Sequence, residues 1–339
     1  MRLLVDVTHP AHVHLFKNAI EAFRDEGAAV RVASREKDVT TRLLDAYGIP
    51  HTVLSKKTGS VPREWVGREL RLLRLARNFG PDVVLSRLNP AAAHVSRLLS
   101  VPNVVFHDNE VAGVVERVTA PFASVVATPT VYRGDFGDKH VRYRGFHELA
   151  YLHPARFTPD PEPLRRAGVD PDAPYAVVRL VDMTAHHDRG HDGFDTDTLG
   201  RLVSELTERC DVYVTAEDGL PAELASYATP VPPEAMHDLL AFADLYVGDS
   251  GTMAAESAVL GTPTVRFDPL GASLGNFDAL TEYGLVDSNT DAEDAVEAAL
   301  ALADDSDADE TWRRRRRDLL AENIDVTGFM TELVAEVAG

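Results

Sequence analysis

The chain has 339 residues, of which 45% are apolar, and its formal net charge is −20. This apolar content suffices for two ordinary cores, which excludes global disorder, and the length predicts two domains. The sequence has no apolar run of the roughly 20 residues that a membrane span needs, and its one cysteine, Cys210, excludes a disulfide framework and a multi-cysteine zinc site. We therefore expect a cytoplasmic protein.

Charge is distributed unevenly along the chain. Residues 1–150 contain 21 Lys and Arg against 16 Asp and Glu (+5), whereas residues 151–339 contain 13 against 38 (−25). Only five of the 34 basic residues are lysines. An acidic, lysine-poor composition indicates a halophilic protein, because salt screens the charge repulsion. The basic first half predicts an anionic ligand or a membrane surface near it, with a chance distribution as the alternative.

Short apolar runs alternate with helical patterns in the first half, which is typical of a parallel sheet with crossover helices. Strands are expected at Leu3–Val7, Ala29–Ala33, His51–Leu54, Asp82–Ser86, Asn103–Phe106 and Ser124–Thr128. The helices between them are expected to begin near His12, Val39, Arg63, Ala91 and Gly113. Residues 1–150 are therefore predicted to form a Rossmann-like α/β domain.

A second α/β series follows a Pro-rich connection at residues 151–174. Its expected strands are Tyr175–Leu180, Val212–Thr215, Leu245–Val247 and Thr264–Phe267, within a second Rossmann-like domain at residues 175–325. A last helix within residues 326–339 is expected to cross back to the first domain. Two doubly wound domains bind ligands at the carboxyl ends of their strands, so we expect a central cleft that both domains face.

The segment from Gly248 to Pro263 predicts an anion site of the strand–turn–helix type. After a buried strand, Gly251 permits close approach of an anion, and the N–H groups of the following helix start bind phosphate oxygens. Ser250 and Thr252 add hydroxyl donors. Glu256 lies about one turn further along the same helix face, where a carboxylate can accept the hydroxyls of a ribose.

The alternative for this segment is an ordinary capped helix. Asp249 or Ser250 would then be the cap, and Glu256 would be solvated.

The same segment resembles the UDP-binding motif of two groups of enzymes: the non-hydrolysing UDP-N-acetylglucosamine 2-epimerases, and the lipid-linked N-acetylglucosaminyltransferases of cell-wall synthesis. Both have the GT-B architecture. The resemblance implies that Ser250, Gly251 and Thr252 bind the diphosphate of a nucleotide sugar, UDP-linked as in those enzymes, and that Glu256 binds its ribose. It also implies that the second domain is the nucleotide-sugar side and the first domain the acceptor side.

Residues 105–113, Val-Phe-His-Asp-Asn-Glu-Val-Ala-Gly, resemble the epimerase segment that ends in His-x-Glu-Ala-Gly. Epimerase carboxylates in this region act as acids and bases at the sugar, which implies that His107, Asp108 and Glu110 face the cleft. A buried hydrogen-bond network at the strand end is the alternative. The turn at residues 86–90 lacks the aspartate of the epimerases, which counts against epimerase activity.

Residues 6–14, Asp-Val-Thr-His-Pro-Ala-His-Val-His, take the place of the Gly-rich turn of the cell-wall transferases, without its glycines. His12 matches the histidine that ends that turn. A histidine at a helix start can accept a proton from a hydroxyl, because its pKa lies near neutrality and the helix dipole favours the neutral form. We therefore predict His12 as the general base, with capping or packing as the alternative for any one histidine here.

Residues 179–194 resemble the Ala-x-His-Asp-x-Gly-His-x-Gly-Phe loop of an uncharacterised, largely archaeal family, domain of unknown function 354. Residues 6–14, 106–110 and 145–154 match this family too, so the resemblance covers nearly the whole chain. The family has only an inferred GT-B glycosyltransferase-like assignment.

Within this loop, Arg179 is expected to neutralise the diphosphate, with His187 at the same site. His187 and His191 have the spacing of metal ligands, but GT-B enzymes generally use a helix dipole and basic side chains instead. We expect no metal, and no cofactor apart from the sugar donor.

Basic residues gather on or before the third expected helix: Lys56, Lys57, Arg63, Arg68, Arg71, Arg74 and Arg77. The last four recur every third residue and should form one stripe. This stripe predicts peripheral contact of the Arg63–Arg77 helix with the inner membrane face, or with a lipid phosphate, and a solvated face is the alternative. No motif for nucleic-acid binding accompanies it, so no nucleic-acid partner is expected.

Together these features predict a glycosyltransferase that moves a sugar from a nucleotide-diphosphate donor to the hydroxyl of a lipid-linked or anionic acceptor. A sugar-nucleotide 2-epimerase, with Glu110 and Glu116 as acid and base, is the second hypothesis. A non-catalytic nucleotide-sugar-binding protein is the third.

Overall fold

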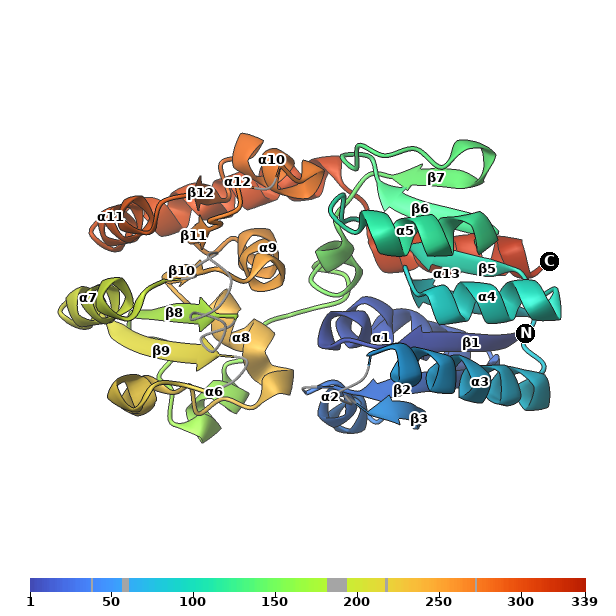
Figure 1. Ribbon diagram of the computed structural model, residues 1–339. Helices are drawn as coiled ribbons and strands as arrows, with labels where there is room; N and C mark the ends of the chain where they lie inside the picture. The colour runs from blue at the N-terminus through green and yellow to red at the C-terminus, as the bar shows by residue number, and fades with distance from the viewer. Residues whose placement is uncertain (38, 57–60, 182–193, 217–218, 272) are drawn as a thin grey trace. The chain divides into compact units, whose positions relative to one another are not determined.

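A computed structural model of the chain describes all residues except 38, 57–60, 182–193, 217–218 and 272 (Figure 1). The chain forms two compact units. The first comprises Met1–Arg156, Leu274–Asn276 and Asn323–Gly339, and the second comprises Phe157–Ser273 and Phe277–Glu322. In the part of the chain that is described, no helix is both long enough and apolar enough to cross a membrane.

The first unit is built on a parallel sheet of seven strands in the order β3-β2-β1-β4-β5-β6-β7. Their bounds are β1 (Arg2–Val7), β2 (Ala29–Glu36), β3 (His51–Lys56), β4 (Val83–Arg87), β5 (Asn103–Phe106), β6 (Val125–Pro129) and β7 (His140–Tyr143). The order reverses between β1 and β4, as in doubly wound dinucleotide-binding folds. This switch point marks the expected ligand edge of the sheet.

Helices cover both faces of this sheet. On one face lie α3 (Val61–Phe79), α4 (Pro90–Leu99) and α5 (Gly113–Thr119), and the core beneath α3 and α4 contains Leu4, Leu54, Leu72, Val84 and Val95. On the other face lie α1 (Pro10–Asp25), α2 (Thr40–Ala46) and α13 (Val326–Ala338). Short 3-10 turns complete the unit: η1 (Ala120–Phe122), η2 (Gly137–Lys139) and η3 (His147–Ala150).

The C-terminal helix α13 packs within the first unit, against α1 (Figure 1). Phe329 places its ring 6.4 Å from that of Phe106 and 5.0 Å from that of Tyr143. The preceding Asp325 caps the helix and pairs with Arg156 at 2.6 Å. The last 17 residues are thus part of the unit that the first 156 residues build.

The second unit has a parallel sheet of five strands in the order β12-β11-β10-β8-β9. Their bounds are β8 (Tyr175–Leu180), β9 (Asp211–Ala216), β10 (Leu245–Gly248), β11 (Thr264–Phe267) and β12 (Asp287–Asn289). The helices are α6 (Glu162–Ala167), α7 (Thr196–Thr207), α8 (Met236–Ala241), α9 (Gly251–Leu260), α10 (Gly275–Glu282), α11 (Ala292–Ala303) and α12 (Ala308–Glu322), with 3-10 turns η5 (Ala222–Tyr227) and η6 (Pro233–Ala235). The order again reverses once, between β8 and β10.

The two faces of the five-stranded sheet differ in what they bury. Val178, Val247 and Val265 point into a core covered by α7 and α11, where the apolar residues of α7 recur at helical spacing. Side chains alternate along a strand, so Arg179, Gly248 and Arg266 lie on the opposite face. That face carries α9, which contacts β10 and β11.

All ten strands expected from the sequence are present, and the α/β class with two Rossmann-like sheets is confirmed. Two further strands, β7 and β12, were not expected. Each lies at a sheet edge and pairs with one neighbour, so it lacks the continuous apolar run of a central strand. The expected connection at residues 151–174 contains α6, and its first residues, Tyr151 and Leu152, are buried.

Candidate functional site

Polar side chains gather at the carboxyl ends of the strands in each unit. In the second unit they surround the start of α9. Val247 is fully buried at the end of β10, and the turn Gly248–Ser250 leads directly into the helix. The first N–H groups of a helix have no partner inside it, and here those of Gly251 and Thr252 find no acceptor in the described chain. The helix start therefore presents unpaired donors and the positive end of its dipole.

The three small residues of this turn differ in their surroundings. Ser250 is the N-cap: its Oγ accepts the N–H of Met253 at 3.4 Å, and the residue is only 8% exposed. Capping, the alternative interpretation, therefore describes Ser250. Thr252 is exposed and keeps its hydroxyl available. A Cβ at Gly251 would meet only Phe277 at 3.5 Å, an ordinary contact, so the backbone does not require glycine there.

Gly248 is the glycine that the geometry requires. A Cβ at this position would lie 2.5 Å from the carbonyl oxygen of Arg179 and 2.8 Å from the hydroxyl of Tyr246. Both distances are shorter than any real contact, so the sheet could not close around a side chain. The sequence pattern indicated Gly251 as the glycine of the site, whereas the structure requires glycine at position 248.

Two arginines stand beside Gly248, one on each neighbouring strand. Gly248 pairs with Arg179 of β8 and with Arg266 of β11, so the three residues share one level and one face of the sheet. Arg179 donates to Thr215 Oγ1 at 2.9 Å, and its Nε is buried with no hydrogen bond. Arg266 was not predicted, although a charge inside the apolar run Thr264–Phe267 was a visible signal.

Arg266 is oriented by contacts on two sides. Its guanidinium lies 3.8 Å from the ring centroid of Phe277 and donates to Asp268 at 2.8 Å, while its Nε is buried without a partner. The residue is 7% exposed, and burial lowers the pKa of its guanidinium. Beside it opens a cavity of about 440 Å³ lined by residues of β11, α10 and β12. A buried, fixed guanidinium beside a cavity is suited to binding an anion.

Glu256 is buried rather than solvated. It is 4% exposed, and its Oε1 lies 3.1 Å from Nε2 of His237 on α8. His237 was not predicted, and nothing in its local sequence distinguishes it. His187, the other residue assigned to the nucleotide sugar, lies outside the described residues.

In the first unit, the centre of the polar cluster is Asp108, directly after β5. Arg87, the last residue of β4, approaches one Asp108 oxygen at 2.5 Å, and Nδ1 of His147 lies 2.9 Å from the other. Burial alone would raise the pKa of Asp108, but Arg87 and His147 outweigh it and hold the pKa well below its usual range. A carboxylate fixed in this way is a poor proton carrier, so Asp108 belongs to a buried network, as the alternative had it.

His107 and Glu110 occupy different surroundings. His107 is 1% exposed, and burial lowers its pKa to about 4. Its Nε2 has no hydrogen bond and lies 3.5 Å from Glu116, whose other contact is the hydroxyl of Tyr132 at 2.9 Å. Glu110 accepts the N–H of Arg133 at 3.3 Å and does not line the pocket that contains His107.

His12 lies at the start of α1, whose N-cap is His9. It is 8% exposed, and burial, helped by the charge of Arg87, lowers its pKa well below the ordinary value, so the ring is neutral at pH 7. Nδ1 lies 3.3 Å from Thr8 Oγ1 and 3.4 Å from the Thr8 N–H. The Thr8 N–H donates to Nδ1, so Thr8 orients the imidazole ring at the start of α1.

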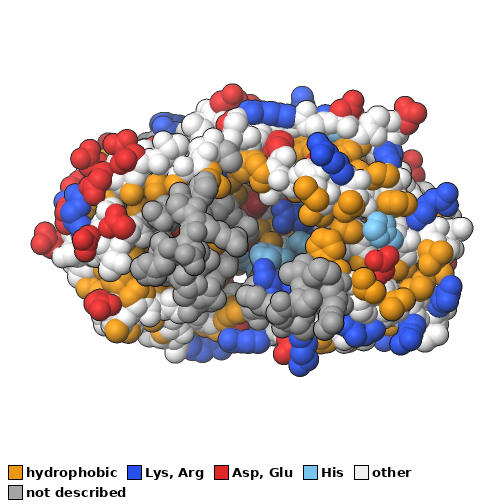
Figure 2. Space-filling view, in the orientation of Figure 1, with side chains coloured by type: hydrophobic (Ala, Val, Ile, Leu, Met, Phe, Trp, Pro, Cys, Tyr) orange, Lys and Arg blue, Asp and Glu red, His pale blue; other side chains and the backbone are white. Residues whose placement is uncertain are grey.

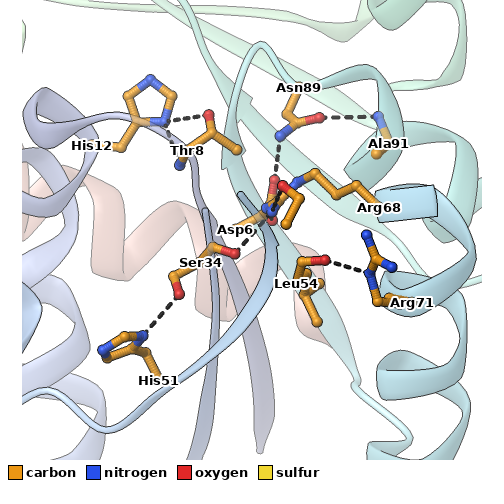
Figure 3. Close-up of polar contacts among 11 residues, drawn as sticks. Asp6, Thr8, His12, Ser34, His51, Leu54, Arg68, Arg71, Asn89 and Ala91 are labelled. Carbon is orange, nitrogen blue, oxygen red and sulfur yellow. Dashed lines mark hydrogen bonds and ion pairs between the residues drawn. The ribbon is translucent and has the colours of Figure 1, made fainter. Parts of the chain in front are cut away.

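A pocket of about 470 Å³ in the first unit brings His12 and His107 together with Arg87 and Asn109. The buried carboxylate of Asp6 orients two of the side chains that line this pocket. Arg68 of α3 and Asn89, the N-cap of α4, both point toward the Asp6 carboxylate and donate to it (Figure 3). Leu88, on the pocket wall, has φ +32°, a conformation that costs a leucine free energy and is concentrated at functional sites.

The burial of Arg68 corrects one expectation. The residue is 4% exposed and also donates to the carbonyl oxygen of Ser34 at 2.9 Å, because it must neutralise the buried Asp6. Arg68 is therefore not part of the exposed basic stripe that was predicted on α3. The other three members, Arg71, Arg74 and Arg77, are exposed.

Comparison with known proteins gives a family and a fold. A family model described as "Protein of unknown function (DUF354)" matches residues 1–338. The chain is 25% identical over 281 residues to "Uncharacterized protein MJ0665" of Methanocaldococcus jannaschii, covering 78% of this chain and 81% of that protein.

Among solved structures, UDP-GlcNAc 2-epimerase from Neisseria meningitidis, bound to UDP-GlcNAc, has a TM-score of 0.70 at 12% identity. Spinosyn forosaminyltransferase has a TM-score of 0.65 at 17% identity, and each comparison covers 99% of both chains. The Streptomyces glycosyltransferase SsfS6, complexed with thymidine diphosphate, has a TM-score of 0.60 at 16% identity, covering 98% of this chain and 99% of that one. These similarities establish the GT-B-like fold.

Proposed function

The chain belongs to the DUF354 family, and we propose that it is a GT-B glycosyltransferase that moves a sugar from a nucleotide-diphosphate donor to an acceptor hydroxyl. The observation that carries the proposal is the pair of arginines on either side of Gly248, Arg179, which is half-buried, and Arg266, which is buried. Together with the unpaired amides at the start of α9, they form a site for a diphosphate. This donor is the only cofactor-like group that the proposal needs, and no metal takes part.

The donor's other contacts follow from the same helix. Thr252 offers its hydroxyl to a phosphate oxygen, and Glu256, oriented by His237, accepts the ribose hydroxyls. The neighbours support this class of ligand, since one is bound to UDP-GlcNAc and another to thymidine diphosphate. We propose a UDP-linked sugar, with His187 as a further contact.

The reaction follows from the groups in the two units. His12, oriented by Thr8, takes the proton of the acceptor hydroxyl. The acceptor oxygen forms a bond to the anomeric carbon of the sugar, and the bond from that carbon to the phosphate oxygen breaks. The nucleoside diphosphate leaves with the electron pair, and its added charge is stabilised by Arg179, Arg266 and the α9 amides.

A 2-epimerase remains the second candidate, because the Neisseria epimerase shares this fold over nearly its whole length. That reaction needs groups that exchange protons at the sugar. Asp108 is ionised in its pairs with Arg87 and His147, Glu110 accepts a backbone N–H, and Glu116 accepts the Tyr132 hydroxyl. These contacts favour the transferase.

A binding and turnover experiment separates the hypotheses. In high salt, UDP and UDP-sugars should raise the melting temperature, since a ligand at 100 times its Kd adds about 2.7 kcal/mol. A transferase releases the nucleoside diphosphate only when an acceptor is added. Conversion of the UDP-sugar without an acceptor would indicate the epimerase, and saturable binding with no turnover over a broad acceptor panel would indicate a binding protein. Absence of any thermal shift with nucleoside diphosphates would refute the donor site.

A further inference from the structure

The pocket of the first unit opens onto an apolar surface. Two of the helices that contribute to its lining carry exposed apolar side chains: Trp65, Val66 and Leu70 on α3, and Val111, Val114 and Val118 on α5 or just before it. Figure 2 shows hydrophobic side chains gathered over the α3–α4–α5 face of this unit. Trp65 and Val118 also line the pocket, so the exposed patch and the interior are continuous. Scattered apolar residues are normal on a surface, but a patch leading into a cavity marks a ligand site.

The opposite end of the pocket is polar. His12, His107 and Asn109 all line the pocket, and Nε2 of His107 lies 3.5 Å from Glu116. The imidazole rings and the Asn109 amide are hydrogen-bonding groups that the hydroxyls of a ligand can use. Leu88, whose backbone is strained, also lines the pocket.

Charges around the pocket balance. The lining includes Arg68 and Arg87. Arg68 forms an ion pair with Asp6, and Arg87 forms one with Asp108, so both charges are neutralised within the protein. The other charged lining residues are Arg35 and Glu69, of opposite sign. This end of the pocket therefore offers hydrogen-bond donors and acceptors without an excess of positive charge.

From this geometry we propose that the pocket binds an amphipathic acceptor, with an uncharged, hydroxylated head group at His12 and His107 and an apolar chain that leaves between α3 and α5. This acceptor class deepens the proposed function and rests on it for the reaction, whereas binding to the pocket can be measured without a donor. It also selects an uncharged head group over the anionic acceptor that the basic first half suggested.

Fluorescence of Trp65 provides the test, because Trp65 is 52% exposed at the pocket, whereas the second tryptophan, Trp312, is 7% exposed in the other unit. Octyl glucoside below its micelle concentration should produce a saturable blue shift that is absent in the Trp65→Phe variant. Glucose alone should produce none, and octyl phosphate should bind no more tightly than octyl glucoside. Equal responses to glucose and octyl glucoside, no saturable response, or tighter binding of octyl phosphate would each overturn the proposal.

Matched variants test where the apolar chain of the acceptor binds. Val118→Asp and Val114→Asp should each weaken octyl glucoside binding about tenfold, because a charge must be desolvated beside the chain. The control is Leu270→Asp, at a leucine of the second unit that is 64% exposed, and it should leave octyl glucoside binding unchanged. Unchanged binding in both valine variants would overturn the proposal. UDP binding is measured in parallel. If octyl glucoside binds and UDP does not, the proposed donor site is refuted and the acceptor pocket is supported. If UDP binds and octyl glucoside does not, the acceptor pocket is refuted and the donor site is supported.

Discussion

Arg179 and Arg266 lie at one level of the five-stranded sheet, each paired in register with Gly248 between them. Strands are spaced about 4.8 Å apart, so the two Cα atoms are roughly 10 Å apart, with a glycine gap between the side chains. A diphosphate bound over Gly248 could contact both arginine side chains. This relationship joins residues 87 positions apart in the chain and rests on the strand order β8-β10-β11.

Replacing Arg266 with Gln should weaken UDP binding about tenfold or more, or about 1.4 kcal/mol, because a charge-assisted hydrogen bond is lost. Arg179→Gln should have a similar effect. Titration calorimetry would measure both. Arg314→Gln, at an exposed arginine of α12 in the same unit, is the matched control. Wild-type affinity in Arg266→Gln would remove this residue from the site.

The two glycines near α9 should respond differently to alanine. Gly248→Ala should lower the melting temperature and the UDP affinity together, because its methyl group would overlap the Arg179 carbonyl. Gly251→Ala should fold normally, since its methyl group meets only Phe277. Thermal unfolding with and without UDP would measure this difference, and equal destabilisation of the two variants would contradict it.

His12→Ala should preserve donor binding and abolish turnover, because the residue is assigned to the acceptor proton and not to the diphosphate. Thr8→Val keeps the shape of Thr8 but removes the hydroxyl that lies 3.3 Å from Nδ1 and helps to orient the ring, and it should lower kcat about 10- to 100-fold. Steady-state rates at saturating donor would measure the effect. Loss of donor binding in His12→Ala, or a wild-type kcat in Thr8→Val, would disprove these assignments.

Acid should destabilise the first unit through its buried histidines. His12, His107 and His147 all have a lowered pKa, mainly from burial, so the folded chain keeps them neutral while the unfolded chain takes up protons below about pH 6.5. Stability is therefore full above pH 6.5 and should fall as the pH drops toward about 4, the pKa of His107. The denaturant midpoint, plotted against pH over this range, should have a shallower slope for His107→Gln than for the wild type. Identical slopes in the variant and the wild type would exclude His107 as a source.

Salt should stabilise the protein. With a net charge of −20, mutual repulsion opposes folding at low ionic strength, and molar KCl screens it. The melting temperature should rise steadily from low to molar KCl. A melting temperature that is the same at both extremes would end the halophilic interpretation.

The amino-acid sequence by itself determined the α/β class, ten of the strands and the strand–turn–helix at residues 247–252, because these features depend on local periodicity and turn chemistry. It also identified His12, Arg179 and Glu256 as site candidates. Only the tertiary structure decided their partners: Thr8 beside His12, Arg266 level with Arg179, and His237 against Glu256.

The same distinction explains the corrected expectations. Helical spacing placed Arg68 on a surface stripe, but its partner Asp6 lies 62 residues away and is brought to it by the packing of α3 on the sheet. The sequence also contained no sign that Arg87 and His147 both contact Asp108. Such contacts depend on which strands become neighbours, and that order is set by burial over the whole sheet rather than by any one segment.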